Sequence, residues 1–300
     1  SGRPLRPLET VDLAAYSHLP ALDIKIENDD CLRYSGLKFD NVSVSVSPMN
    51  MRIRLYYCGL RGINFLAELL APMADVLVMA PDGGRSGMGC AITSTQPVYY
   101  NLVSEREGIT IYRCSGTPVD CIKMALHEFA DRQPDMIIGG INHGDNSGVN
   151  VHYSGTMGIV IEGCMKGIPS VGFSLDNHSP EADFEPCAPY IVKIVEQVLE
   201  RGLPNGTCLN VNFPATPIYE GVKVCRMAKG EWTQEWEEHP HPRGGNYFWL
   251  VGSFCLRDDH PHDADRPNLT EGYVAVTPIQ IDMTDYRMME EMINDWDLNL

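Results

Sequence analysis

Two polar, glycine-containing segments each follow a short apolar run that is long enough for a buried strand. The segment at 80–87 contains Ser86, whose hydroxyl is suited to ligating a metal ion or holding a phosphate oxygen. The segment at 138–146 contains Asn142 and Asn146, neutral oxygen donors of the kind that Mg²⁺ or Mn²⁺ accepts. Each segment alone is also typical of an ordinary turn between a strand and a helix. Together they indicate a site for a metal ion and a phosphate group.

A further polar stretch opens a predicted helix. Ser154 and Thr156 are first of all expected to cap this helix. The first amides of a helix also attract an anion, so Ser154, Gly155 and Thr156 are predicted to bind phosphate together with Asn146. His143 is a single histidine in a loop, which is more typical of a hydrogen-bonding group than of a catalytic base.

Short apolar runs alternate with amphipathic stretches through the middle of the chain. The predicted strands lie at 76–80, 109–114, 136–138, 170–173 and 208–211. The predicted helices lie at 63–70, 119–130, 156–165 and 190–201. This alternation favours an α/β fold, a mostly parallel sheet with helices on both faces, whose ligand sites lie at the carboxyl ends of the strands.

The character of the sequence changes on either side of this core. Residues 1–60 are expected to form an irregular segment with possible strands at 21–26, 42–46 and 53–57, and residues 61–214 to form the core. Residues 215–300 are expected to be an extension with strands at 222–227 and 272–278, an aromatic-rich stretch at 231–249, a loop at 258–267 and a terminal helix. Hairpins in this extension would serve oligomerisation.

Composition narrows the classes of partner. The formal net charge of −17 repels a phosphate backbone at long range, so a nucleic-acid polymer is not an expected ligand, whereas a bound divalent cation can reverse the field locally. The ten cysteines include no C-x-x-C pair, and no apolar stretch is long enough to span a membrane. We expect a cytoplasmic protein with reduced thiols and no membrane association.

At this point the sequence resembles a known family, the survival protein SurE family. The matching motifs occur in the family's order at 80–87, 115–121, 140–146, 153–156, 162–163, 210–214 and 272–278. The resemblance covers roughly residue 61 to the C-terminus. It implies a Rossmann-like three-layer fold with a protruding β-rich C-terminal arm, a homodimer or homotetramer, and removal of phosphate from nucleoside monophosphates by a 5′/3′-nucleotidase.

The resemblance also implies one divalent cation per subunit, Mg²⁺ or Mn²⁺, held by two adjacent Asp, a Ser and an Asn. The Ser and Asn correspond to Ser86 and Asn142. The register of the family's Asn-Asp-Asp-Gly motif is occupied here by residues 54–57, which contain no carboxylate. Upstream, Asp29 and Asp30 follow a possible strand, although Cys31 stands where the family has Gly.

We therefore predict a metal site made by Asp29, Asp30, Ser86 and Asn142, with Asp29 orienting or deprotonating the attacking water. The alternative for the Asp pair is a solvated acidic turn. Two rival functions follow: a nucleotide-binding relative that has lost its metal site, and an assembly protein that acts through its aromatic arm.

Overall fold

The computed structural model describes residues 52–56, 60–129, 131, 133–258 and 261–298. All of them belong to the unit that runs from Met51 to Leu300. The possible strands at 21–26 and 42–46, together with Asp29 and Asp30, lie outside the described residues.

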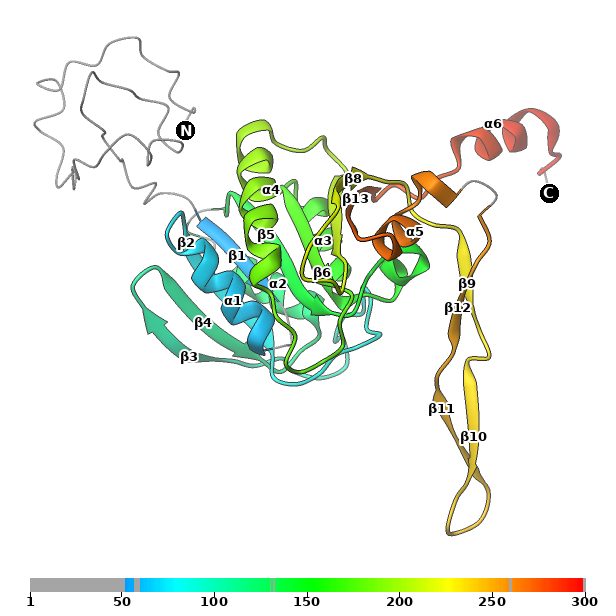
Figure 1. Ribbon diagram of the computed structural model, residues 1–300, viewed down its shortest axis with the longest axis horizontal. Coiled ribbons are helices and arrows are strands. Elements are labelled where there is room, and N and C mark those ends of the chain that lie inside the picture. Colours follow the sequence, from blue (N-terminus) through cyan, green and yellow to red (C-terminus); the bar gives the residue numbers. More distant parts are fainter. Residues whose placement is uncertain (1–51, 57–59, 130, 132, 259–260, 299–300) are drawn as a thin grey trace, which may run out of the picture. The chain divides into compact units, whose positions relative to one another are not determined.

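A nine-stranded sheet forms the centre of this unit, in the order β3-β4-β2-β1-β5-β6-β7-β13-β8 (Figure 1). Its strands are β1 (Arg52–Tyr56), β2 (Asp75–Pro81), β3 (Tyr100–Arg106), β4 (Ile109–Cys114), β5 (Met136–His143), β6 (Ser170–Leu175), β7 (Thr207–Phe213), β8 (Gly221–Val224) and β13 (Tyr273–Gln280). The strands from β4 to β7 in this order run parallel to one another, while β3 and β13 are antiparallel to their neighbours β4 and β7. The predicted α/β fold with a mostly parallel sheet is confirmed.

Helices cover both faces of the sheet, as Figure 1 shows. They are α1 (Leu60–Leu70) and α4 (Ala188–Arg201) on one face, and α2 (Pro118–Glu128) and α3 (Gly155–Met165) on the other. Side chains alternate along β2, so that successive residues pack against the helices on opposite faces of the sheet. Val76 and Val78 pack in the cluster that includes α1 and α4, whereas Leu77 and Met79 pack in the cluster that includes α2.

The strand that leads into the first helix is β1. It lies between β2 and β5, with Ile53 opposite Val76 on one side and Met136 on the other. Ile53 is fully buried, which explains why this short segment holds its place in the centre of the sheet. The place before α1 is therefore filled by residues 52–56, whereas the possible strand at 21–26 lies outside the described residues.

The predicted strands and helices of the core are confirmed, with ends that differ by a few residues. The prediction missed β3, an edge strand whose residues are nearly all exposed and which therefore lacks the alternation that marks a half-buried strand. The loop prediction at 258–267 was partly wrong, because it overlaps the 3₁₀ turn η4 (Pro261–Asp263) and the start of α5 (Asp265–Thr270). Pro267 stands in the first turn of α5, where a proline is tolerated.

The C-terminal part contains the expected strands and terminal helix. Strands β9 (Gly230–Thr233) and β12 (Ser253–Leu256) pair, as do β10 (Trp236–Pro240) and β11 (Asn246–Leu250). They form a two-stranded ribbon, which we call the arm, that extends away from the sheet (Figure 1). The terminal helix α6 (Tyr286–Asp295) buries none of its residues within the described chain. In the described part, no helix is both long and apolar enough to cross a membrane.

Two glycines allow the backbone to pack closely where β5 ends. A Cβ on Gly62 in α1 would lie 2.4 Å from the carbonyl oxygen of Ile141. A Cβ on Gly140 would lie 2.2 Å from the carbonyl oxygen of Phe173 in β6, and Gly140 has φ +119°. Side chains at either position would push α1 or β6 away from β5. The pairing of β5 with β6 is irregular between Gly139 and Asn142, so the end of β5 departs from a regular strand.

A capping box fixes the start of α2. The Thr117 side chain accepts a hydrogen bond from the Asp120 amide, and the Asp120 carboxylate accepts one from the Thr117 amide. Asp120 also accepts the Thr93 amide at 3.0 Å, which ties the segment after β2 to this helix. Burial opposes ionisation of Asp120, but the hydrogen bonds from Thr93 and Thr117 outweigh it and lower its pKa.

Replacing Asp120 by Ala should lower the free energy of unfolding at pH 7 by about 1–2 kcal/mol, because the cap is lost. The lowered pKa means that the carboxylate stabilises the fold above its unfolded pKa of about 3.9, and that this contribution disappears as pH falls through the folded pKa. Urea unfolding at pH 7 and at pH 3.5 should therefore show a smaller difference from wild type at the lower pH. The exposed Glu107→Ala is the control and should change stability by less than about 0.5 kcal/mol. An Asp120→Ala difference that is equal at both pH values would contradict this account.

Candidate functional site

The segments predicted to carry chemistry lie at the carboxyl edge of the parallel strands, and several of them touch. The amide of Gly89, in the segment after β2, donates to the carbonyl of Tyr153 at 2.9 Å, just before α3. Arg85 donates to the carbonyl of Ser115 at 3.1 Å, just after β4. These contacts bring the segments after β2 and β4 together with the start of α3.

The segment after β2 is held by Arg85 and leaves Ser86 exposed. Arg85 forms an ion pair with Asp82 at 3.0 Å in addition to its bond to Ser115. Its Nε is buried and has no hydrogen-bond partner among the described residues. Because a buried N–H without an acceptor costs free energy, this atom favours an acceptor brought by a ligand.

The start of α3 has the cap that the sequence predicts. The Ser154 side chain accepts from the Met157 amide at 3.1 Å. The first amides of a helix have no acceptor within the helix, and here they are those of Gly155 and Thr156. The Thr156 hydroxyl is buried without a hydrogen-bond partner in the described chain. Free amides, the positive end of the helix dipole and this hydroxyl together suit a phosphate oxygen.

The end of β5 carries Asn142 and His143. The Asn142 amide nitrogen donates to the carbonyl of Gly144 at 2.6 Å, which fixes the orientation of its half-buried side chain. The His143 Nδ1 lies 3.1 Å from the carbonyl of Ser179, and its ring meets Phe184 edge-on with centroids 5.2 Å apart. His143 thus has one hydrogen-bonding contact and one packing contact, both with the segment between β6 and α4.

Asn146 lies deeper than the other predicted site residues and is 5% exposed. Its side-chain amide donates to the Ser174 hydroxyl at 2.7 Å, and its backbone amide donates to the Asn212 side chain at 2.7 Å. Asn210 donates to the Asn146 carbonyl at 2.8 Å and accepts from Asn212. In this structure Asn146 is the centre of a buried polar network, and a contact with phosphate stays a prediction.

This network was not predicted from the sequence. Asn210 and Asn212 are two residues apart in β7, so their side chains lie on the same face of the strand. Two asparagines at this spacing inside an apolar strand are a signal of a buried polar network, because buried amides need partners.

A second set of residues missed from the sequence ties α5 to the end of β5. Arg266 forms ion pairs with Asp145 and, at 3.9 Å, with Asp176. Burial raises the pKa of Asp176, and the negative charge of Asp145 adds to this effect. Asp145 and Asp176 share the guanidinium of Arg266. The pair of Arg266 with Asp145 fixes the segment after β5 against the C-terminal half.

Asp265 makes the same connection through backbone amides. Its fully buried carboxylate accepts from Gly148 at 3.0 Å, from Ala228 at 2.9 Å and from Arg266 at 2.7 Å. Burial raises the pKa of this carboxyl, although the three amides favour its charged form. Because residues 258–267 are rich in Asp, His and Pro, the sequence predicted a loop there and gave no sign that Asp265 and Arg266 hold these segments together.

The donor types at this edge fit a hard cation in part. Ser86 and Asn142 are neutral oxygen donors, and within the described residues no group of three His, Cys, Asp or Glu could hold a metal ion. The sequence of β1 contains no carboxylate. The predicted carboxylate ligands Asp29 and Asp30 lie outside the described residues, and their role stays a prediction.

This fold defines a Rossmann-like α/β protein, and its predicted site residues lie at the carboxyl edge of the sheet. The family model described as "Survival protein SurE" matches residues 58–234. The chain is 58% identical over 240 residues to the 5′-nucleotidase SurE of Phocaeicola vulgatus, covering 80% of this chain and 93% of that protein. It is 57% identical over 232 residues to the 5′-nucleotidase SurE of Bacteroides thetaiotaomicron, covering 77% and 90%.

A solved structure agrees with these sequence matches. The crystal structure of the SurE protein from Aquifex aeolicus superposes with a TM-score of 0.69 at 32% identity, covering 81% of this chain and all of that one. The chain therefore belongs to the survival protein SurE family. The match to the family model begins at residue 58, so Asp29 and Asp30 lie outside it.

Replacing Arg266 by Ala should lower the free energy of unfolding by about 3 kcal/mol, because Asp145 keeps a buried charge without its cation. The matched control is Arg257→Ala, which removes an arginine whose ion pair with Glu231 is exposed and which should cost less than about 1 kcal/mol. Chemical denaturation of both variants measures the difference. Equal losses would mean that the Asp145–Arg266 pair does not hold the segment after β5.

Proposed function

We propose that this protein is a divalent-metal-dependent nucleotidase that hydrolyses nucleoside monophosphates to nucleoside and phosphate. The observation that carries the proposal is the pair of relatives named 5′-nucleotidase SurE, which are 57–58% identical and match over at least 90% of their own length. The carboxyl edge of the sheet supports the proposal independently. The Arg85 Nε and the Thr156 hydroxyl lie there, and both are buried without a hydrogen-bond partner in the described chain.

The anion would be held by α3 and by the segment after β2. The amides of Gly155 and Thr156 at the start of α3 would donate to a phosphate oxygen, and Ser154 caps that helix end. The buried Thr156 hydroxyl and Arg85 Nε each lack a partner in the described chain and would gain one. Donors that are already fixed stabilise the charge that develops on the phosphoryl oxygens during transfer.

Ser86 and Asn142 would hold the cation, Mg²⁺ or Mn²⁺ at one per subunit, together with the carboxylates of Asp29 and Asp30. When bound, such a cation polarises the phosphoryl group and makes a water more acidic. Asp29 would accept the proton of the attacking water. Asn146, through its bonds to Ser174 and Asn212, would position the segment that carries Asn142, in addition to its predicted contact with phosphate.

One observation favours a second candidate, a relative that binds nucleotides without hydrolysing them. The strand before α1 is β1, and neither β1 nor the three residues that follow it contain a carboxylate. If Asp29 and Asp30 do not reach the site, the anion-binding edge would persist without its strongest metal ligands.

Assembly into a homodimer or homotetramer is part of the proposal. The arm exposes large apolar side chains, among them Trp236, Phe248, Trp249 and Leu250. Exposed apolar surface of this extent is typical of contacts between subunits. The eight cysteines of the described part are free thiols, which suits the expected cytoplasmic location.

Phosphate release should be measured from 5′- and 3′-nucleoside monophosphates with Mn²⁺, with Mg²⁺ and with EDTA. We expect release that depends on the cation and stops with EDTA. Nucleotide binding with no release under any condition would reject the nucleotidase and select the binding relative. Neither binding nor release, from a folded oligomer, would reject both.

Ser86→Ala should lower kcat/KM by at least about tenfold. Loss of a residue that only hydrogen-bonds to a metal ligand already costs about that much, and Ser86 is proposed as a ligand itself. The matched control is Ser94→Ala, an exposed serine in the same connection between β2 and β3, which should leave kcat/KM unchanged.

Asp30→Asn should abolish cation-dependent turnover. Unchanged activity of Asp30→Asn would remove the Asp pair from the site while leaving Ser86 to be judged by its own variant.

A further inference from the structure

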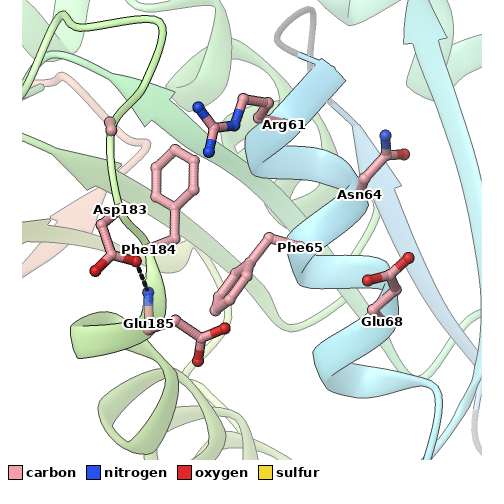
Figure 2. A pocket seen from close by; sticks show the side chains of 8 residues that line it. Arg61, Asn64, Phe65, Glu68, Asp183, Phe184 and Glu185 are labelled. Atoms are coloured by element: carbon pink, nitrogen blue, oxygen red, sulfur yellow. Dashed lines mark hydrogen bonds between the residues drawn. The ribbon is translucent and has the colours of Figure 1, made fainter.

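A cavity of about 290 Å³ lies between α1 and the segment that joins β6 to α4. Figure 2 shows the side chains that line it, from Arg61, Phe65 and Glu68 on α1 and from Asp183, Phe184 and Glu185 on the opposite wall. Arg61 holds the two walls together, since it donates to the carbonyl of Pro180 at 2.8 Å and to the Glu181 carboxylate at 2.6 Å.

One wall of this cavity lies near Asn142, a residue of the proposed cation site. Phe184, in its wall, meets the ring of His143, which directly follows Asn142 at the end of β5. The same histidine contacts the carbonyl of Ser179 in the segment that forms this wall. A nucleotide that crosses the carboxyl edge from the start of α3, past Asn142, to the α1 side of the sheet would therefore bring its base toward this cavity.

The apolar part of the cavity is aromatic. The rings of Phe65 and Phe184 have centroids 5.9 Å apart and are tilted by 40°. A planar ring inserted between them would need about 7 Å, twice the usual carbon–carbon contact of ~3.5 Å. A flat ligand must therefore lie against the half-buried Phe65 rather than between the two rings.

The polar part of the cavity is acidic. Arg61 already pairs with Glu181, and Glu68 pairs with Arg106 at 3.0 Å. Asp183 accepts the backbone amide of Glu185 at 3.0 Å. The exposed carboxylate of Glu185 points toward Phe65 in Figure 2 and makes no hydrogen bond to the described residues. This surface repels a phosphate group and accepts hydrogen bonds from N–H groups.

We infer that this cavity is the base pocket of the nucleotide site, and that Glu185 selects bases with an exocyclic amino group. The inference rests on the proposed nucleotidase function for the identity of the ligand. The base stacks on Phe65 while its amino group donates to the Glu185 carboxylate. Phe65 and Glu185 are specificity-determining residues that leave the reacting phosphate untouched.

The first experiment measures nucleoside binding without hydrolysis. Adenosine and purine riboside differ only in the exocyclic amino group, and their dissociation constants can be compared by equilibrium dialysis. We expect adenosine to bind at least about tenfold more tightly, as a hydrogen bond to a charged acceptor implies. Equal affinity, or no binding of either nucleoside, would overturn the inference.

Variants assign the effect to the cavity. Phe65→Ala should weaken both nucleosides by about tenfold, the effect of losing a stacking partner. Phe65→Leu keeps an apolar side chain in place and should also weaken binding, so a folding defect of the Ala variant would not hide the result. Glu185→Ala should abolish the preference for adenosine, whereas Glu200→Ala removes the same charge from the far end of α4 and should preserve it. Wild-type behaviour of Phe65→Leu or of Glu185→Ala would contradict the assignment.

Hydrolysis separates this inference from the proposed function. Phe65→Ala should raise KM for AMP by about tenfold and leave KM for glycerol 2-phosphate, which has no aromatic ring to stack, unchanged. Failure of the wild type to hydrolyse either substrate would reject the nucleotidase, while the binding measurements still decide the base pocket. Equal effects of Phe65→Ala on both substrates would reject the base pocket while leaving the nucleotidase intact.

Discussion

The direction of the central strands is the constraint on which the rest of the structure depends. Because β4, β2, β1, β5, β6 and β7 run parallel, each of them delivers the following residues to the same edge of the sheet. Segments that are far apart in the sequence, such as those carrying Ser86 and Ser154, become neighbours without any requirement on the residues between them. The close backbone contacts of Gly62 and Gly140 are needed because this edge is crowded.

Buried charged groups join the two halves of the chain, in addition to the pairing of β13 with β7 and the apolar packing around it. Asp265 accepts backbone amides of Gly148 and Ala228, one beside the candidate site and the other at the root of the arm. Arg266, the next residue, pairs with Asp145 at the end of β5. A short helix therefore carries two groups that fix the site segment and the arm to a common point. Such directional contacts define position more sharply than apolar packing, which tolerates sliding.

The sequence predicted the elements that apolar periodicity marks. Helices with a buried face, such as α1 and α4, and strands buried on both sides, such as β2, were found with small errors at their ends. The edge strand β3 has no buried face, and α5 begins in a segment rich in Asp, His and Pro, so neither carried a signal that local patterns reveal. For the site, residue types and spacing correctly predicted the cap of α3, whereas the roles of Ser86 and Asn142 stay predictions. The partners of Asn146 and Asp145 come from distant strands and helices, and pairing at such separations is set by tertiary structure.

The way β1 is held separates the formation of the sheet from the chemistry of its edge. A strand in the middle of a sheet is retained mainly by its main-chain ladder and by a few buried side chains, here Ile53. Folding therefore places little constraint on the residues just beyond the carboxyl end of this strand. The chemistry of a site at this edge would constrain those residues. At this point of the chain the sheet can therefore form whatever residues follow β1, so a well-formed sheet is not by itself a sign that the chemistry of this edge is intact.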